Sequence, residues 1–132
     1  MTQEDKNILL QDLCSRLPYG VKCEIKGEKE IYTLNRIEID YENGHLFDFK
    51  EQKNGFNMQV YSSEVKPYLF PLDSMTDEQK EEWKSLVIQE AFGKSDRAFT
   101  VQDFYNINHI DCKGLIPTGL ANNATGLGIY EQ

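Results

Sequence analysis

Residues 21–61 decide the fold, and they read VKCEIKGEKEIYTLNRIEIDYENGHLFDFKEQKNGFNMQVY. Apolar and polar side chains alternate along Val21–Lys26, which is typical of a strand with one buried face. The pairs Asn43-Gly44 and Asn54-Gly55 are strong hairpin signals, because both central residues of a type I′ turn need a positive φ. The stretch therefore predicts consecutive strands joined by tight turns.

The second of these strands contains an interruption. Isoleucines and a threonine share odd-numbered positions from Ile31 to Ile39, but apolar Leu34 and polar Asn35 break that phase. A β-bulge at these two residues accommodates the break. We predict a four-stranded antiparallel meander with one solvated face, and its strands are 21–26, 30–41, 45–50 and 56–61.

Helices are predicted before and after the meander in the sequence. Thr2 can cap an amphipathic helix that Pro18-Tyr19-Gly20 ends. Thr76-Asp77-Glu78-Gln79 is a capping box, and Thr100 begins a further short helix. We expect the first helix and the helix that contains Trp83 to pack on the apolar face of the sheet.

Two segments are unusual for a small domain. Pro67–Leu72 places two prolines among large apolar side chains, which predicts a buried crossover after a single helical turn at 62–66. Gly114–Tyr130 contains no charge and many apolar residues, so we expect an ordered tail. The fold class is α+β: an N-terminal helix, the meander, two C-terminal helices and the tail. It forms one domain, 1–132, with 114–132 packed on the body or on a partner.

The charge restricts the classes of partner. The chain has 14 Lys and Arg against 22 Asp and Glu, a net charge of −8. Direct nucleic-acid binding draws on a basic surface, so we do not expect it. No apolar run is long enough for a membrane helix and the first residues lack a basic leader, so we expect a cytoplasmic protein without a membrane association. We expect no cofactor and a monomer or weak homo-oligomer.

His109, Asp111 and Cys112 have the residue types of thiol catalysis. Residues this close in the sequence rarely converge on a reacting atom, since a Cys–His pair needs side chains from separate segments. The more economical interpretation is packing or capping by His109. A zinc site that adds Cys23 or Cys14 would offer only one pair of ligands at the usual spacing, so we expect no metal.

Aromatic residues concentrate in the second half of the chain. They could line a binding groove or form a core at helical spacing; they are Tyr68, Phe70, Trp83, Phe92, Phe99, Phe104 and Tyr105. From the two unusual segments, the candidate residues for contact with a protein partner are Tyr68, Phe70, Leu115, Ile116 and Leu120.

Three segments together resemble a known family. Leu13–Val21, Val65–Thr76 and Gly114–Ala121 are similar to segments of short uncharacterised cytosolic proteins of gut Bacteroidales and their prophages or mobile elements. Members of that family more often have an aromatic residue where this chain has Cys112. The resemblance implies a bacterial or phage cytosol, and it implies no activity, cofactor or catalytic residue.

Two classes of function follow from these observations. The first is a non-enzymatic interaction or accessory protein of a phage or mobile element, including an acidic inhibitor that occupies a nucleic-acid-binding site on another protein. The second is a small enzyme or ligand-binding domain with a pocket near His109, Asp111 and Cys112. The second class requires these three side chains to share a concave site.

Overall fold

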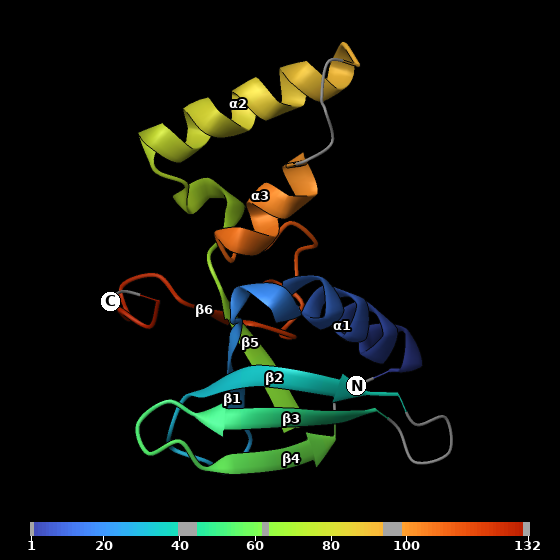
Figure 1. Ribbon diagram of the computed structural model, residues 1–132, viewed down its shortest axis with the longest axis vertical. Helices are drawn as coiled ribbons and strands as arrows, with labels where there is room; N and C mark the ends of the chain where they lie inside the picture. Colours follow the sequence, from blue (N-terminus) through green and yellow to red (C-terminus); the bar gives the residue numbers. More distant parts are fainter. Residues whose placement is uncertain (1, 40–44, 62–63, 94–98, 131–132) are drawn as a thin grey trace.

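The computed structural model describes residues 2–39, 45–61, 64–93 and 99–130, and their fold is α+β (Figure 1). Two short 3-10 turns, Leu17–Tyr19 and Leu72–Ser74, lie between the regular elements. The elements in chain order are α1 (Gln3–Arg16), β1 (Lys22–Ile25), β2 (Tyr32–Glu38), β3 (Leu46–Glu51), β4 (Asn57–Tyr61), β5 (Val65–Leu69), α2 (Asp77–Ala91), α3 (Val101–Ile107) and β6 (Asn122–Asn123).

The strands form one sheet in the order β4-β3-β2-β1-β5-β6. Strands β1 to β4 are antiparallel neighbours in sequence order, which confirms the meander. Four strands were too few, however, because β5 pairs antiparallel with β1 and β6 pairs parallel with β5. The sheet therefore continues beyond β1 with two strands, β5 and β6, from segments that were predicted to be a crossover and a tail.

Strand β5 contains Pro67, and the predicted crossover is wrong for this residue. The N–H of Lys26 donates to the carbonyl of Glu64 at 2.8 Å. From this pair, hydrogen-bonded and non-hydrogen-bonded pairs of residues alternate along β1 and β5. Pro67 faces Cys23 at a position that exchanges no hydrogen bond. Its missing N–H therefore removes no bond to β1. The predicted helical turn at 62–66 is wrong from Val65 onwards, because Val65 is the first residue of β5. Residues 62–63 of that turn lie outside the described ranges.

The predicted bulge in β2 is confirmed. The register with β3 shifts between Leu34 and Arg36, which leaves Asn35 as the additional residue. Tyr32 and Leu34 are buried before the bulge, and Ile37 packs against the core after it. The odd-numbered phase is therefore wrong before the bulge, where the even-numbered side chains enter the core. After the bulge it holds for Ile37 but not for Ile39, which is 45% exposed.

The β3–β4 hairpin forms, but without the predicted type I′ turn. The N–H of Glu51 donates to the carbonyl of Phe56 at 2.7 Å, so the loop has four residues, 52–55. Gly55 has a φ of 75° and donates its N–H to the carbonyl of Glu51, whereas Asn54 has no positive φ. The other predicted turn, Asn43-Gly44, lies outside the described residues.

All three helices begin where the sequence places them. Thr2, Thr76 and Thr100 each accept the N–H of the third helical residue, and that residue's side chain accepts the N–H of the threonine in return. The threonines thus satisfy donors that a helix leaves unpaired at its first turn.

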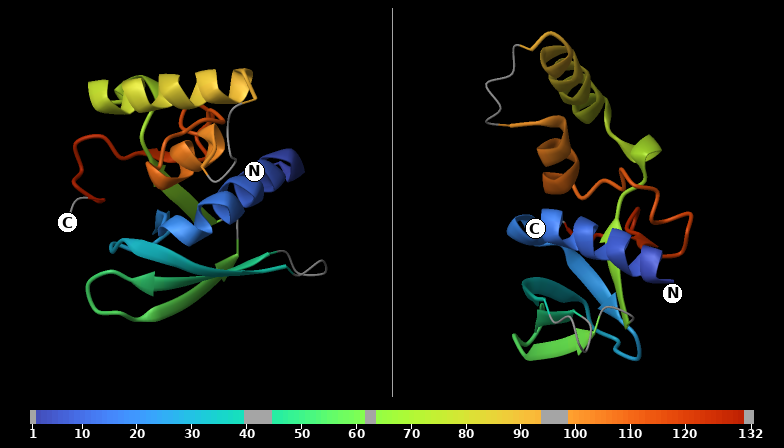
Figure 2. Two further views of the ribbon diagram at one scale, coloured as in Figure 1. Left: turned by 45° about the horizontal axis from the view of Figure 1, so that its top comes forward. Right: turned by 90° about the vertical axis from the view of Figure 1, so that its right-hand side faces the viewer.

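The expected place of α2 is wrong. No residue of α2 is buried, and α3 lies between α2 and the rest of the fold (Figures 1 and 2). The two helices meet through Trp83, whose indole N–H donates to the hydroxyl of Tyr105 at 2.8 Å. Helix α1 does contribute to the sheet core, as expected, and the tail supplies the apolar side chains that α2 does not.

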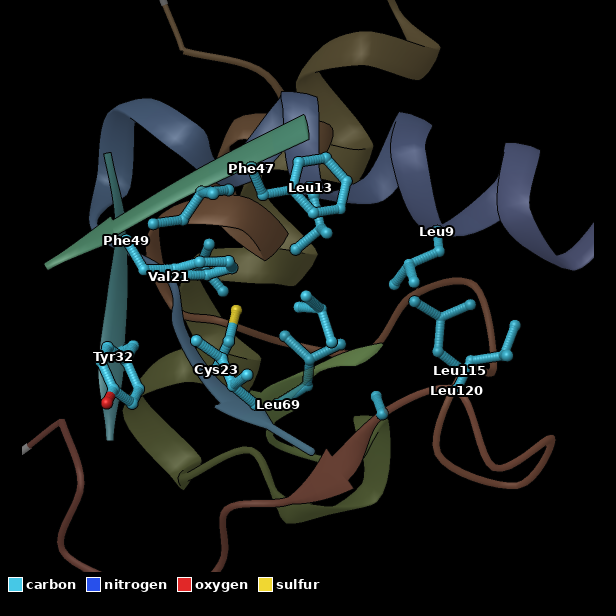
Figure 3. Packing of buried hydrophobic residues seen from close by; sticks show 14 residues of the cluster. Leu9, Leu13, Val21, Cys23, Tyr32, Phe47, Phe49, Leu69, Leu115 and Leu120 are labelled. Atoms are coloured by element: carbon cyan, nitrogen blue, oxygen red, sulfur yellow. The ribbon is translucent and has the colours of Figure 1, made fainter. Parts of the chain in front are cut away.

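The core lies among α1, the sheet and the tail (Figure 3). Helix α1 contributes one stripe, the inner faces of β1, β2, β3 and β5 contribute most of the rest, and Leu115 and Leu120 come from the tail. The labelled members are Leu9, Leu13, Val21, Cys23, Tyr32, Phe47, Phe49, Leu69, Leu115 and Leu120.

A buried ion pair joins α1 to the second half of the chain. Arg16 and Asp12 are 0% and 1% exposed, and Nε of Arg16 lies 2.8 Å from Oδ2 of Asp12. The guanidinium also donates to the carbonyls of Tyr105, in α3, and of Ile110, between α3 and the tail. One side chain therefore connects three segments.

We expect Arg16→Met to lower the free energy of unfolding by about 3–5 kcal/mol, because it leaves the Asp12 carboxylate buried without its partner. Arg36→Met is the matched control, since Arg36 is 66% exposed and its nitrogen lies 3.8 Å from Asp48; it should cost less than about 1 kcal/mol. Urea unfolding monitored by circular dichroism measures both. Equal losses in the two variants would contradict this role for Arg16.

Candidate functional site

His109 has an unusual backbone for a residue that is not glycine. It follows α3 with a φ of 56°, in the left-handed region. Its carbonyl accepts the N–H of Phe70 at 2.8 Å, and the N–H of Asp111 donates to the carbonyl of Phe70 at 2.8 Å. This bridge attaches the chain after α3 to the end of β5, and it turns the imidazole towards the tail.

Tyr130 closes the site from the other side. Its ring stacks on the imidazole of His109, with centroids 3.7 Å apart and planes 12° from parallel. Its hydroxyl accepts the N–H of Lys22 at 2.9 Å and donates to the carbonyl of Tyr68 at 2.7 Å. The ammonium of Lys22 donates to the carbonyl of Ile129 at 3.2 Å. These contacts, which we call the Tyr130 clamp, hold the tail on β1 and β5.

The environment of His109 favours a neutral imidazole. Burial lowers its pKa to about 4, and the nearby charges of Arg16 in α1 and Lys22 in β1 act in the same direction. Nδ1 is buried and has no hydrogen-bond partner. The stack on Tyr130 is therefore an interaction of neutral rings at ordinary pH.

Asp111 and Cys112 have separate partners. Both carboxylate oxygens of Asp111 accept backbone N–H groups, from Leu115 at 2.8 Å and from Ile116 at 2.9 Å, so this side chain organises the first turn of the tail. Sγ of Cys112, which is half-buried, lies 3.6 Å from the side-chain amide of Gln102. Within the described part of the chain, no hydrogen bond joins the side chains of His109, Asp111 and Cys112 to one another.

The cysteines considered for a zinc site lie apart. Cys23 is fully buried in the sheet core, where burial raises the pKa of its thiol, and Cys14 is exposed on α1. Among the described residues, no three or more His, Cys, Asp or Glu side chains are placed to hold a metal ion. Cavities of about 460, 630 and 450 Å³ are lined by residues other than His109, Asp111 and Cys112.

The five candidates for contact with a partner divide into two groups. Leu115 and Leu120 are 1% and 7% exposed and belong to the core, so they offer no surface. Tyr68 and Phe70 are half-buried beside the tail, and Ile116 is half-buried within it. Phe70 also lies 5.9 Å from Tyr130 between ring centroids, which adds it to the packing around the clamp.

Sequence reasoning missed the residues that complete this site. Tyr130 and Lys22 are 108 residues apart, and Arg16 is 94 residues from Ile110, so no local pattern relates them. The one available signal was an aromatic hydroxyl near the end of an uncharged, apolar segment. Such a side chain usually finds a hydrogen-bond partner when it is buried.

Among the large apolar side chains on the described surface, the one with the highest exposed fraction lies at the C-terminal end of α2. Phe92, directly after the helix, is 72% exposed, and Ile88, one turn before it, is 56% exposed. A helical rotation of 100° per residue places both roughly opposite Trp83, which faces α3. We call the exposed face around Ile88 and Phe92 the α2 surface.

Comparisons with family models, with curated proteins and with solved structures found no match for this chain. Among the described helices, none combines the length and the apolar composition that crossing a bilayer requires. The Tyr130 clamp and the α2 surface are the features of this chain from which a function can be inferred.

The clamp predicts a loss of stability in acid. Between pH 6.5 and about 4 the unfolded chain binds a proton at His109 that the folded chain does not, so the free energy of unfolding falls as the pH drops through this interval. The stability that the neutral imidazole contributes is complete above pH 6.5, and at most about 3 kcal/mol of the free energy of unfolding is lost by pH 4.

Denaturant unfolding at a series of pH values tests this expectation against His109→Asn. Asparagine tolerates the left-handed backbone but does not titrate. The other acid-titrating groups are common to both proteins, so the difference between the two profiles isolates His109. Parallel profiles would show that the imidazole does not cause the loss.

Proposed function

We propose that this chain is a non-enzymatic interaction protein, an accessory or regulatory factor of a phage or mobile element, and that it binds a protein partner through the α2 surface. The observation that carries the proposal is that a 15-residue helix with an apolar pair at its C-terminal end has no buried residue. Exposed apolar pairs one helical turn apart are the usual anchors of a helix that enters a groove.

The geometry of α2 supports a face that is free to bind. Three side chains on one side of the helix contact α3 or the residue after it: Gln79 with Asn108, Trp83 with Tyr105, and Glu90 with the N–H of Val101. These contacts hold α2 on α3 through this side of the helix. The opposite side displays Ile88 and Phe92.

The charge of α2 supports a basic partner. Helix α2 carries five acidic residues (Asp77, Glu78, Glu81, Glu82 and Glu90) against Lys80 and Lys84, a net charge of −3 within a chain of −8. The proposed partner is a protein with an apolar groove bordered by Lys or Arg. Charge complementarity of this kind speeds association and suppresses wrong partners.

The alternative, a small enzyme or ligand-binding domain around His109, Asp111 and Cys112, has no observation in its favour. The stack on Tyr130 covers His109, and both oxygens of Asp111 accept backbone N–H groups. A catalytic use of these residues would have to break the turn and the stack that hold the tail.

The test compares two exposed phenylalanines. A photo-crosslinking phenylalanine analogue replaces Phe92 or Phe56, which are 72% and 67% exposed, in the full chain expressed in the bacterium that encodes it. We expect one protein other than a second copy of this chain to be crosslinked from position 92 and not from 56, and its crosslinked surface to contain Lys or Arg beside apolar residues.

The binding constant of that protein then measures the contribution of the surface. A buried aromatic anchor contributes about 2 kcal/mol or more, so Phe92→Ala should weaken binding about 30-fold and Phe56→Ala less than about threefold. Higher salt should weaken binding by the wild-type chain. Crosslinks to that protein in equal yield from both positions, or binding that is unchanged in Phe92→Ala, would overturn the proposal.

A further inference from the structure

Strand β4 forms one edge of the sheet, and within the described residues no strand pairs with its outer side (Figure 1). Its sequence, Asn57-Met58-Gln59-Val60-Tyr61, contains no charge and no proline, although 27% of the chain is charged. It pairs with β3 without a register shift. Edge strands are commonly protected from further pairing by Lys, Pro or a bulge, and β4 has none of these.

The hydrogen-bond phase determines which groups of β4 point outwards. Glu51 and Phe56 form a hydrogen-bonded pair through the N–H of Glu51, and bonded pairs then alternate along the ladder. Met58 and Val60 therefore direct their backbone groups to β3. Asn57, Gln59 and Tyr61 direct theirs away from the sheet.

We propose that β4 is an interface for a second copy of this chain, which adds its own β4 antiparallel about a two-fold axis at Gln59. In that register Asn57 lies opposite Tyr61 of the second copy, and Gln59 lies opposite itself. The outward residues of each strand thus meet the outward residues of the other, and every outward N–H and C=O of the three finds a partner. A two-fold axis of this kind closes the assembly at a dimer.

The side chains agree with this register. Met58 and Val60 lie on the core face, where both pack against the apolar cluster. In the dimer, Met58 of each copy faces Val60 of the other. Asn57 and Tyr61 meet on the outer face. The dimer thus extends the apolar layer across the two-fold axis.

Strand β4 offers no carboxylate to the basic partner proposed for α2, and its lack of charge permits a copy of this chain to pair there. No like charges face one another along the paired strands, although each chain carries −8. The remaining repulsion acts over longer distances and is screened by salt. We therefore expect salt to strengthen the dimer, which is the opposite of its expected effect on the α2 surface.

Sedimentation velocity tests the interface. Pairing of one five-residue strand is small compared with the roughly 1,200 Å² of a stable interface, so we expect wild type to change from monomer to dimer between about 10 µM and about 1 mM, and more completely at higher salt. Gln59→Lys places two ammonium groups opposite each other at the axis and should remain a monomer throughout.

Gln89→Lys is the matched control, because it makes the same change of charge at an exposed position of α2. It should dimerise like wild type. A wild type that stays monomeric at about 1 mM, or Gln59→Lys that dimerises equally, would overturn the proposal. Gln59→Lys leaves the α2 surface intact, so its result is independent of binding to a basic partner.

Amide hydrogen exchange gives a second readout that only this register predicts. The amides of Asn57, Gln59 and Tyr61 should gain protection as the protein concentration rises, whereas those of Met58 and Val60 should be protected at every concentration. Protection that does not alternate along β4, or that is independent of concentration, would contradict the pairing.

Discussion

The structure depends on one buried ion pair. Arg16 and Asp12 are side chains of a single helix, but the guanidinium also donates to the carbonyls of Tyr105 in α3 and of Ile110 between α3 and the tail. A buried guanidinium must satisfy its donors within the protein, and Asp12, Tyr105 and Ile110 accept from it here. The pair therefore specifies how the second half of the chain attaches to the first, and the position of His109 follows from that attachment.

Features that depend on neighbouring residues could be predicted from the sequence. The threonine caps at Thr2, Thr76 and Thr100 need only side chains three residues away, and the bulge at Asn35 shows in the phase of its own strand. Features that depend on distant segments could not. Pro67 is compatible with a strand only because of the register that β1 provides, and nothing within 77–91 indicates that the tail, rather than this helix, covers the sheet.

The candidate site shows the same division. The sequence suggested a common site for His109, Asp111 and Cys112 because they are close in the chain. In the fold, their side chains contact different neighbours. The capping of the tail by Asp111 spans five residues and is a local feature, whereas the stack of His109 on Tyr130 requires the whole fold. The resemblance to proteins of gut Bacteroidales and their mobile elements stays a prediction, because nothing in the fold bears on origin.

The Tyr130 clamp also has a kinetic consequence. Its hydrogen bond to Lys22 closes a loop of 108 residues, whereas the hairpins of the meander close loops of a few residues. Loop-closure entropy delays distant contacts until nearer ones have formed. We therefore expect the meander and α1 to assemble first, and the tail to dock late on a surface that already exists. In unfolding, we expect the tail to be the segment whose detachment opens the core with the least disruption of the sheet.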